Sequence, residues 1–153
     1  MGTDDRILTL DLPLKAPRAA IYRCLTEPGL LQQWFAPRPH RVTQAELDVA
    51  PGGGAHIVMR LDDGQEMPLW HTYLEVVRNE RLVFTDAYRC AWEPSERPFM
   101  TVIITLADEG AGTRYIARAC HWSVEDRKAH EAMGFHEGWG ICARQLEELA
   151  AGL

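Results

Sequence analysis

The sequence lacks the residue groupings that mark common nucleophilic enzymes and thiol-based metal sites. Its four cysteines include no C-x-x-C pair, which excludes a zinc ribbon and a thioredoxin-like redox site. The only serines are Ser95 and Ser123, and neither stands in a G-x-S-x-G motif. Cys120 and His121 are neighbours on a predicted strand, so their side chains should point to opposite faces and cannot form a catalytic pair. We therefore expect buried, structural thiols, no disulfide framework and no catalytic residues of these kinds.

The histidines also lack the spacing of a metal site. His130 and His136 each begin an H-E pair, but glycine occupies the positions where H-E-x-x-H would need its second histidine. The two residues are six positions apart in a predicted helix and should face different ways. Three further histidines lie on separate predicted strands and could converge only through tertiary structure: His56, His71 and His121. We expect solvated or hydrogen-bonded histidines, no metal and no cofactor.

Positive charge and long apolar runs are likewise scarce. The 22 acidic residues outnumber the 16 basic ones and give a formal net charge of −6. This charge disfavours nucleic acids and anionic membrane surfaces as partners, because binding to either begins with a basic surface. No apolar run is long enough to span a bilayer, and the first residues are acidic, unlike a secretion signal. The expectation is a cytoplasmic protein that binds neither nucleic acid nor membrane.

The remaining composition is that of a folded globular protein. The 153 residues are 46% hydrophobic and 25% charged, which excludes a disordered or collagen-like chain. A chain of this length buries roughly 70% of the surface that it exposes when unfolded. No internal repeat or flexible linker divides it. We expect one domain spanning residues 1–153.

Local patterns predict strands in the middle of the chain and helices on both sides of them. Leucines at every second position predict a first strand, and two short helices follow it. The later strands are separated by turns too short for the crossovers that parallel strands need, which predicts an antiparallel meander. The predicted strands are 7–14, 41–48, 56–61, 66–77, 81–88, 100–106 and 113–122, and the predicted short helices are 17–26 and 28–35.

A long C-terminal helix is predicted from residue 123 onward. Ser123 can cap its first turn, with an acidic residue three positions later. Three glycines interrupt it, Gly134, Gly138 and Gly140, and each costs about 1 kcal/mol relative to alanine. Either close approach to the sheet or a kink beside a cavity should offset that cost. The apolar side chains form one stripe at steps of three and four: Ala132, Phe135, Trp139, Cys142, Leu146, Leu149 and Leu153.

Four segments resemble the START-like (SRPBCC) superfamily, in the branch similar to the C-terminal domain of the Hsp90 ATPase activator Aha1. They are residues 16–34, residues 73–85, residues 101–106 with Gly112 and Thr113, and Gly138 and Trp139 with Leu146 and Leu149. The resemblance covers nearly the whole chain in the right order. It implies an α+β helix-grip fold, also called START-like or Bet v 1-like. In this fold a curved antiparallel sheet wraps around the long C-terminal helix, two short helices follow the first strand, and a hydrophobic pocket lies between sheet and helix.

The candidate ligand-binding residues are large apolar side chains expected to face that pocket, with two polar residues that could orient a ligand. Together they would form the kind of wall that small apolar ligands use. They are Trp34, Met59, Trp70, Phe84, Tyr88, Val102, Ile104, Phe135 and Trp139, with Arg118 and His121 as the polar pair.

Three functions remain open. The first is non-enzymatic binding of a small hydrophobic or amphipathic molecule. The second, implied by the resemblance, is regulation of a chaperone or another protein partner, which would connect the protein with stress response. The absence of the activators' partner-binding N-terminal domain from this sequence disfavours it. The third is a cyclase- or hydrolase-like enzyme that uses Arg118, His121 or an acidic residue for acid–base chemistry, and the lack of a compact catalytic motif disfavours that one.

Overall fold

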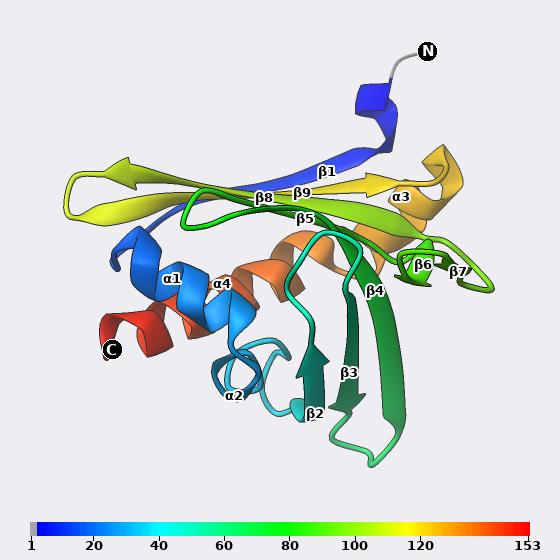
Figure 1. The fold of residues 1–153 in the computed structure, drawn as a ribbon, viewed down its shortest axis with the longest axis horizontal. Coiled ribbons are helices and arrows are strands. Elements are labelled where there is room, and N and C mark those ends of the chain that lie inside the picture. The colour runs from blue at the N-terminus through cyan, green and yellow to red at the C-terminus, as the bar shows by residue number, and fades with distance from the viewer. Residues whose placement is uncertain (1–2) are drawn as a thin grey trace.

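A curved antiparallel sheet forms one layer of the protein, and helices lie in the angle between its two halves (Figure 1). The computed structural model describes residues 3–153. Their helical elements are η1 (Thr3–Arg6), α1 (Arg18–Thr26), α2 (Pro28–Leu31), α3 (Val124–Ala132) and α4 (Phe135–Ala151). Their strands are β1 (Ile7–Leu14), β2 (Arg41–Leu47), β3 (Gly54–Arg60), β4 (Glu66–Val77), β5 (Arg81–Thr85), β6 (Tyr88–Cys90), β7 (Glu93–Pro94), β8 (Met100–Glu109) and β9 (Gly112–His121).

The main sheet has the order β1-β9-β8-β5-β4-β3-β2, and every neighbouring pair is antiparallel. The predicted meander from β2 to β9 is confirmed, and β1 pairs with β9 at the edge opposite β2. A register shift between Tyr73 and Glu75 marks an irregularity in β4. Irregularities of this kind bend a strand. Figure 1 shows β2, β3 and β4 running down one side while β1, β8 and β9 cross above α4. The α+β helix-grip fold predicted from the sequence is confirmed.

The strand predicted over residues 81–88 is shorter in the structure. It ends at Thr85, whose hydroxyl accepts a hydrogen bond from the Ala87 N–H. The Asp86 carboxylate then accepts hydrogen bonds from the N–H groups of Phe99 and Met100. These bonds turn the chain out of the main sheet, and the next residues form the small hairpin β6-β7.

The predicted single C-terminal helix is wrong in one respect, because the structure has two helices there. The Ser123 hydroxyl caps α3 by accepting from the Asp126 N–H, as predicted. However, α3 buries no residue, and the chain leaves the helical path at Gly134, where φ is 94°. Glycine adopts this conformation at little steric cost. Two ends of the predicted apolar stripe are also exposed: Ala132 at the end of α3 and Leu153 beyond α4.

The core lies where α1 and α4 pack on the concave face of the sheet. Buried leucines of β1 meet Ile21 of α1 and Leu146 of α4, both with no exposed surface. The predicted pair of short helices after β1 is confirmed, although α2 ends at Leu31, before Trp34 and Phe35. No helix in residues 3–153 has the length and apolar character needed to cross a membrane.

One buried polar side chain fixes the position of α4. The Gln145 amide nitrogen donates to the carbonyl oxygens of Trp34 and Ala36, at 3.0 and 2.8 Å. Its amide oxygen accepts from the Arg38 N–H at 3.0 Å. The side chain thus satisfies three backbone groups of the segment that follows α2. The Trp34 indole in turn donates to the Cys24 carbonyl oxygen at 2.7 Å, which joins this segment to α1.

Replacing this amide should destabilise the protein strongly. In Gln145→Leu the two carbonyl groups and one N–H group lose their partners, which should cost about 2–4 kcal/mol of unfolding free energy. Urea denaturation at pH 7.5 measures it. Glu148→Leu on the exposed face of α4 is the matched control and should change stability by no more than about 0.5 kcal/mol. Equal stability of Gln145→Leu and the wild type would show that these bonds do not hold the segment.

Candidate functional site

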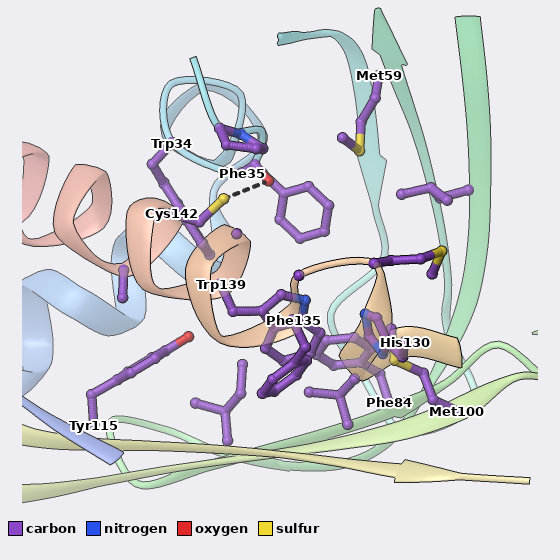
Figure 2. Close-up of a pocket in the computed structure, with 18 residues that line it drawn as sticks. Trp34, Phe35, Met59, Phe84, Met100, Tyr115, His130, Phe135, Trp139 and Cys142 are labelled. Atoms are coloured by element: carbon purple, nitrogen blue, oxygen red, sulfur yellow. Dashed lines mark hydrogen bonds between the residues drawn. The ribbon is translucent and has the colours of Figure 1, made fainter. Parts of the chain in front are cut away.

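A cavity of about 340 Å³ lies between α4 and the sheet. Figure 2 shows its wall, to which α3, α4, the segment after α2 and strands of the main sheet contribute. None of the lining residues carries a carboxylate, an ammonium or a guanidinium group. They are Trp34, Phe35, Pro37, Met59, Leu69, Phe84, Met100, Val102, Ile104, Tyr115, His130, Met133, Gly134, Phe135, Gly138, Trp139, Cys142 and Ala143.

Two glycines at the start of α4, Gly134 and Gly138, help to leave this space open because they have no side chains. A Cβ atom added to Gly134 or Gly138 would meet no heavy atom within 4 Å. The two glycines therefore do not serve close packing against the sheet. Of the two alternatives predicted for them, the kink beside a cavity is confirmed, since Gly134 breaks the helix and both residues line the cavity.

Seven of the eleven candidate ligand-binding residues line the cavity: Trp34, Met59, Phe84, Val102, Ile104, Phe135 and Trp139. They were expected there as large apolar side chains that face the gap between sheet and helix. Their role in binding a ligand stays a prediction.

The other four candidates lie outside the lining, so their predicted placement is corrected. Trp70 is on the outer face of β4, where its ring stacks on His56 with centroids 3.7 Å apart and Arg89 lies 4.8 Å from its ring. Tyr88 is exposed in the β6-β7 hairpin. Arg118 alternates with the buried Ala117 and Ala119 and therefore faces outward. His121 is buried on the inner face but lies behind another histidine.

Sequence reasoning missed several lining residues, and for some of them a signal was present. Met100 has the same parity as Val102 and Ile104 on β8, and Tyr115 has the same parity as Ala117 on β9, so period two could have identified both. Phe35 and Pro37 lie in irregular chain, where periodicity makes no prediction. His130 had no signal, because α3 has no apolar face.

A pair of histidines stands at the cavity. His121 Nε2 lies 2.8 Å from His130 Nδ1, and His121 Nδ1 lies 2.9 Å from the Arg6 carbonyl oxygen. The His130 ring packs against Phe99, Phe135 and Trp139, with centroids 5.1 to 5.8 Å apart. Burial, with a smaller contribution from the charge of His121, lowers the pKa of His130 to about 4. His130 is therefore uncharged at neutral pH.

The other polar groups of the lining are also uncharged. Burial raises the pKa of the Cys142 thiol to about 11, and its Sγ donates to the Phe35 carbonyl oxygen at 3.5 Å. Burial likewise raises the pKa of Tyr115. Cys24 is fully buried with a pKa of about 11, as expected for a structural thiol. The cavity is thus a neutral, mainly apolar site that contains no thiolate.

Among residues 3–153, no three histidine, cysteine, aspartate or glutamate side chains lie close enough together to hold a metal ion. The two histidines at the cavity use three of their four ring nitrogens in the bonds described above.

Comparison with known proteins identifies one family to which the chain is similar. The sequence model of "Activator of Hsp90 ATPase homolog 1-like protein" matches residues 15–151. Among solved structures, a Nitrosomonas europaea protein is 41% identical, with a TM-score of 0.92 over 95% of this chain and 94% of that chain. A Mycobacterium smegmatis protein is 24% identical, with a TM-score of 0.81 over 97% of this chain and 92% of that chain.

A Rhodobacter sphaeroides protein shares the fold at 20% identity, with a TM-score of 0.84 over 97% of this chain and 95% of that chain. No curated protein matches the chain.

His71 behind the cavity wall should make the protein sensitive to acid. Its ring is 8% exposed and packs 4.4 Å from the ring of Phe84, and burial lowers its pKa to about 4. Between pH 6.5 and 4 the unfolded chain therefore binds a proton that the folded chain excludes, so stability falls as the pH falls. Between pH 7 and 4.5 this residue should cost the folded state about 2 kcal/mol.

Urea denaturation of the wild type and His71→Phe at a series of pH values tests this. The variant should lose about 2 kcal/mol less than the wild type over the same range, because phenylalanine takes up no proton. Parallel curves for the two proteins would contradict the prediction.

Proposed function

The chain belongs to the family of Activator of Hsp90 ATPase homolog 1-like proteins, and we propose that it binds a small hydrophobic or amphipathic molecule in the cavity between α4 and the sheet. The observation that carries the proposal is the cavity itself. Its volume of about 340 Å³ lies within the range of roughly 300–1,000 Å³ typical of ligand pockets. Its size suits a compact molecule of one or two rings better than a long lipid chain.

The composition of the wall supports an uncharged ligand. Burying a charge costs far more than burying an apolar group unless an opposite charge accompanies it. The described lining offers no such charge, and His130 is neutral near pH 7 because of its lowered pKa. A ligand would gain free energy by burying its apolar surface, and a few polar atoms would orient it.

The absence of a side chain at Gly138 supports the same conclusion, because it lowers the stability of α4. A larger residue at position 138 would fill space and also raise helix propensity by about 0.5–1 kcal/mol. The protein nevertheless has glycine there, beside an unfilled volume. Access for a ligand would explain why this position lacks a side chain.

Met133 is the exposed part of the cavity wall, and the proposal places the entry of a ligand there. It lies between α3 and α4, is 72% exposed and still contributes to the lining. Because methionine is flexible, it can move aside at small cost.

Acid–base catalysis in the same cavity is a second candidate, favoured by the His121–His130 pair. A base whose pKa is about 4 accepts protons weakly at neutral pH. The nearby Cys142 is a protonated thiol and not a nucleophile. We therefore favour binding over catalysis. Regulation of a chaperone remains a hypothesis that rests on the family's description alone.

The proposal is tested by filling the cavity from α4. Gly138 lines the cavity, and nothing lies within 4 Å of a Cβ atom added there, so the side chain of Gly138→Leu should occupy part of the cavity. We expect binding of the neutral probe N-phenyl-1-naphthylamine, followed by its fluorescence, to weaken at least about tenfold, while the melting temperature rises.

Gly140→Leu is the matched control. Its Cβ atom is equally free of contacts, but it lies beside a groove on the other side of α4 and not in the cavity lining. This variant should be as stable as Gly138→Leu and bind the probe like the wild type. If Gly138→Leu binds normally, the cavity is not the binding site. If the wild type binds no probe and native mass spectrometry finds no co-purifying small molecule, the proposed function is wrong.

A further inference from the structure

The hydrogen bonds of His121 determine which of its nitrogens carries a proton. His121 is 3% exposed, and its Nδ1 lies 2.9 Å from the carbonyl oxygen of Arg6. A carbonyl oxygen can only accept a hydrogen bond, so Nδ1 of His121 must carry the hydrogen. In a neutral ring, Nε2 of His121 then has a free lone pair and acts as an acceptor.

The same reasoning extends to His130. Its Nδ1 is 2.8 Å from the accepting Nε2 of His121, so Nδ1 of His130 carries the hydrogen and donates it. The neutral His130 ring is left with a lone pair on Nε2. The hydrogen bond from His121 to the Arg6 carbonyl group and the bond from His130 to His121 thus fix the tautomer of His130 in the cavity wall.

The Nε2 atom of His130 is therefore an unused acceptor. Among residues 3–153, the only hydrogen bond of the His130 side chain is the one between its Nδ1 and His121, and the ring lines the cavity. The His130 ring packs against Phe99, Phe135 and Trp139, whose carbon edges cannot donate a conventional hydrogen bond. The other polar side-chain groups of the lining belong to Trp34, Tyr115, Trp139 and Cys142. The Trp34 N–H and the Cys142 thiol donate to backbone carbonyl groups, and in the view of Figure 2 Tyr115 and His130 lie on opposite sides of Phe135 and Trp139.

A ligand that supplied a hydrogen to this nitrogen would complete the chain of bonds. A hydroxyl group fits, because it donates one hydrogen and is uncharged. A carboxylate does not fit, because it has no hydrogen to donate and the described lining contains no cation to pair with it. A purely apolar molecule would bury the Nε2 atom without a partner, which is unfavourable.

We propose that the cavity selects an uncharged, compact apolar molecule that carries a hydroxyl group or an equivalent hydrogen-bond donor, and that Nε2 of His130 accepts its hydrogen. His121 acts as a positioning residue, which holds His130 in the accepting tautomer. This inference rests on the proposed function, because it requires that the cavity bind a ligand.

Isothermal titration calorimetry at pH 7.5 with two probes of nearly equal size tests the inference. 1-Naphthol carries a hydroxyl group where 1-methylnaphthalene carries a methyl group. For each protein, the ratio of the two dissociation constants measures the preference for the hydroxyl group. We expect this preference to fall roughly three- to tenfold from the wild type to His130→Phe, which is the range of one net hydrogen bond. His136→Phe is the matched control, since His136 contacts Phe135 but is absent from the lining, and its ratio should equal that of the wild type.

The possible failures are distinguishable. If both probes bind the wild type and His130→Phe leaves the ratio unchanged, the cavity binds ligands but His130 is not the acceptor. If 1-naphthoate binds the wild type as tightly as 1-naphthol, the selection of an uncharged donor is wrong. If neither neutral probe binds the wild type, the proposed function itself fails, and the inference falls with it.

A measurement on the wild type keeps the inference testable if His130→Phe does not fold. Nitrogen NMR of the protein labelled at histidine distinguishes protonated from unprotonated ring nitrogens. In the free protein we expect both His121 and His130 to be protonated on Nδ1 and unprotonated on Nε2. Adding 1-naphthol should shift the Nε2 signal of His130 in the direction of a hydrogen-bonded nitrogen. A protonated Nε2 in free His130, or a signal that 1-naphthol does not shift, would overturn the inference.

The role of His121 is tested through its effect on His130. In His121→Phe the Nδ1 atom of His130 loses its acceptor, so the ring can place its hydrogen on either nitrogen. We expect the Nε2 signal of His130 to move toward the average of two tautomers, and the preference for 1-naphthol to decrease. An unchanged tautomer in this variant would show that His121 does not position His130.

Discussion

The buried amide of Gln145 is the interaction on which the shape of the cavity depends. Its three hydrogen bonds hold the segment after α2 against α4, and that segment supplies Trp34, Phe35 and Pro37 to the wall. A buried backbone carbonyl group needs a partner, and among residues 3–153 no backbone N–H group donates to the carbonyl groups of Trp34 and Ala36. The glutamine supplies these partners from the facing helix. It thereby fixes one wall of the cavity and the position of the helix at once.

The cavity exists because the elements around it cannot close the gap. The strand β4 has an irregular register at Leu74, which lets the sheet bend, and α4 begins only after the left-handed Gly134. Side chains absent from Gly134 and Gly138 leave space where a continuous amphipathic helix would have filled it. A close-packed interior would be more stable. The unfilled volume is therefore the observation on which the proposed ligand binding rests.

Family membership and site chemistry answer different questions about this protein. The family match and the neighbouring structures establish the fold, but one fold can carry many functions. The description of the family refers to a chaperone activator, whereas the cavity is mainly apolar and no residue in its described lining carries a carboxylate, ammonium or guanidinium group. The functional argument therefore rests on the lining of the cavity and on the histidine pair.

Much of the fold could be predicted from the sequence, because period-two and helical patterns are local. Leu8, Leu10 and Leu14 indicated β1, and Val102 and Ile104 indicated that β8 has one apolar face, which the structure buries. The glycines of the C-terminal segment indicated a kink but not its position. Part of the cavity wall followed from the same patterns, whereas Trp70, Tyr88 and Arg118 were assigned to the wrong surface because periodicity does not say which face is inside.

The sequence by itself determined the order of the elements, the antiparallel meander and the residues that form the apolar faces, since each depends on neighbours a few positions apart. Only the tertiary structure decided that Gln145 meets backbone groups more than a hundred positions away. It also decided that His121 at the end of β9 meets His130 on α3, with the Arg6 carbonyl group behind them. Such contacts depend on how the helices pack on the curved sheet, and no local pattern of residue types records that packing.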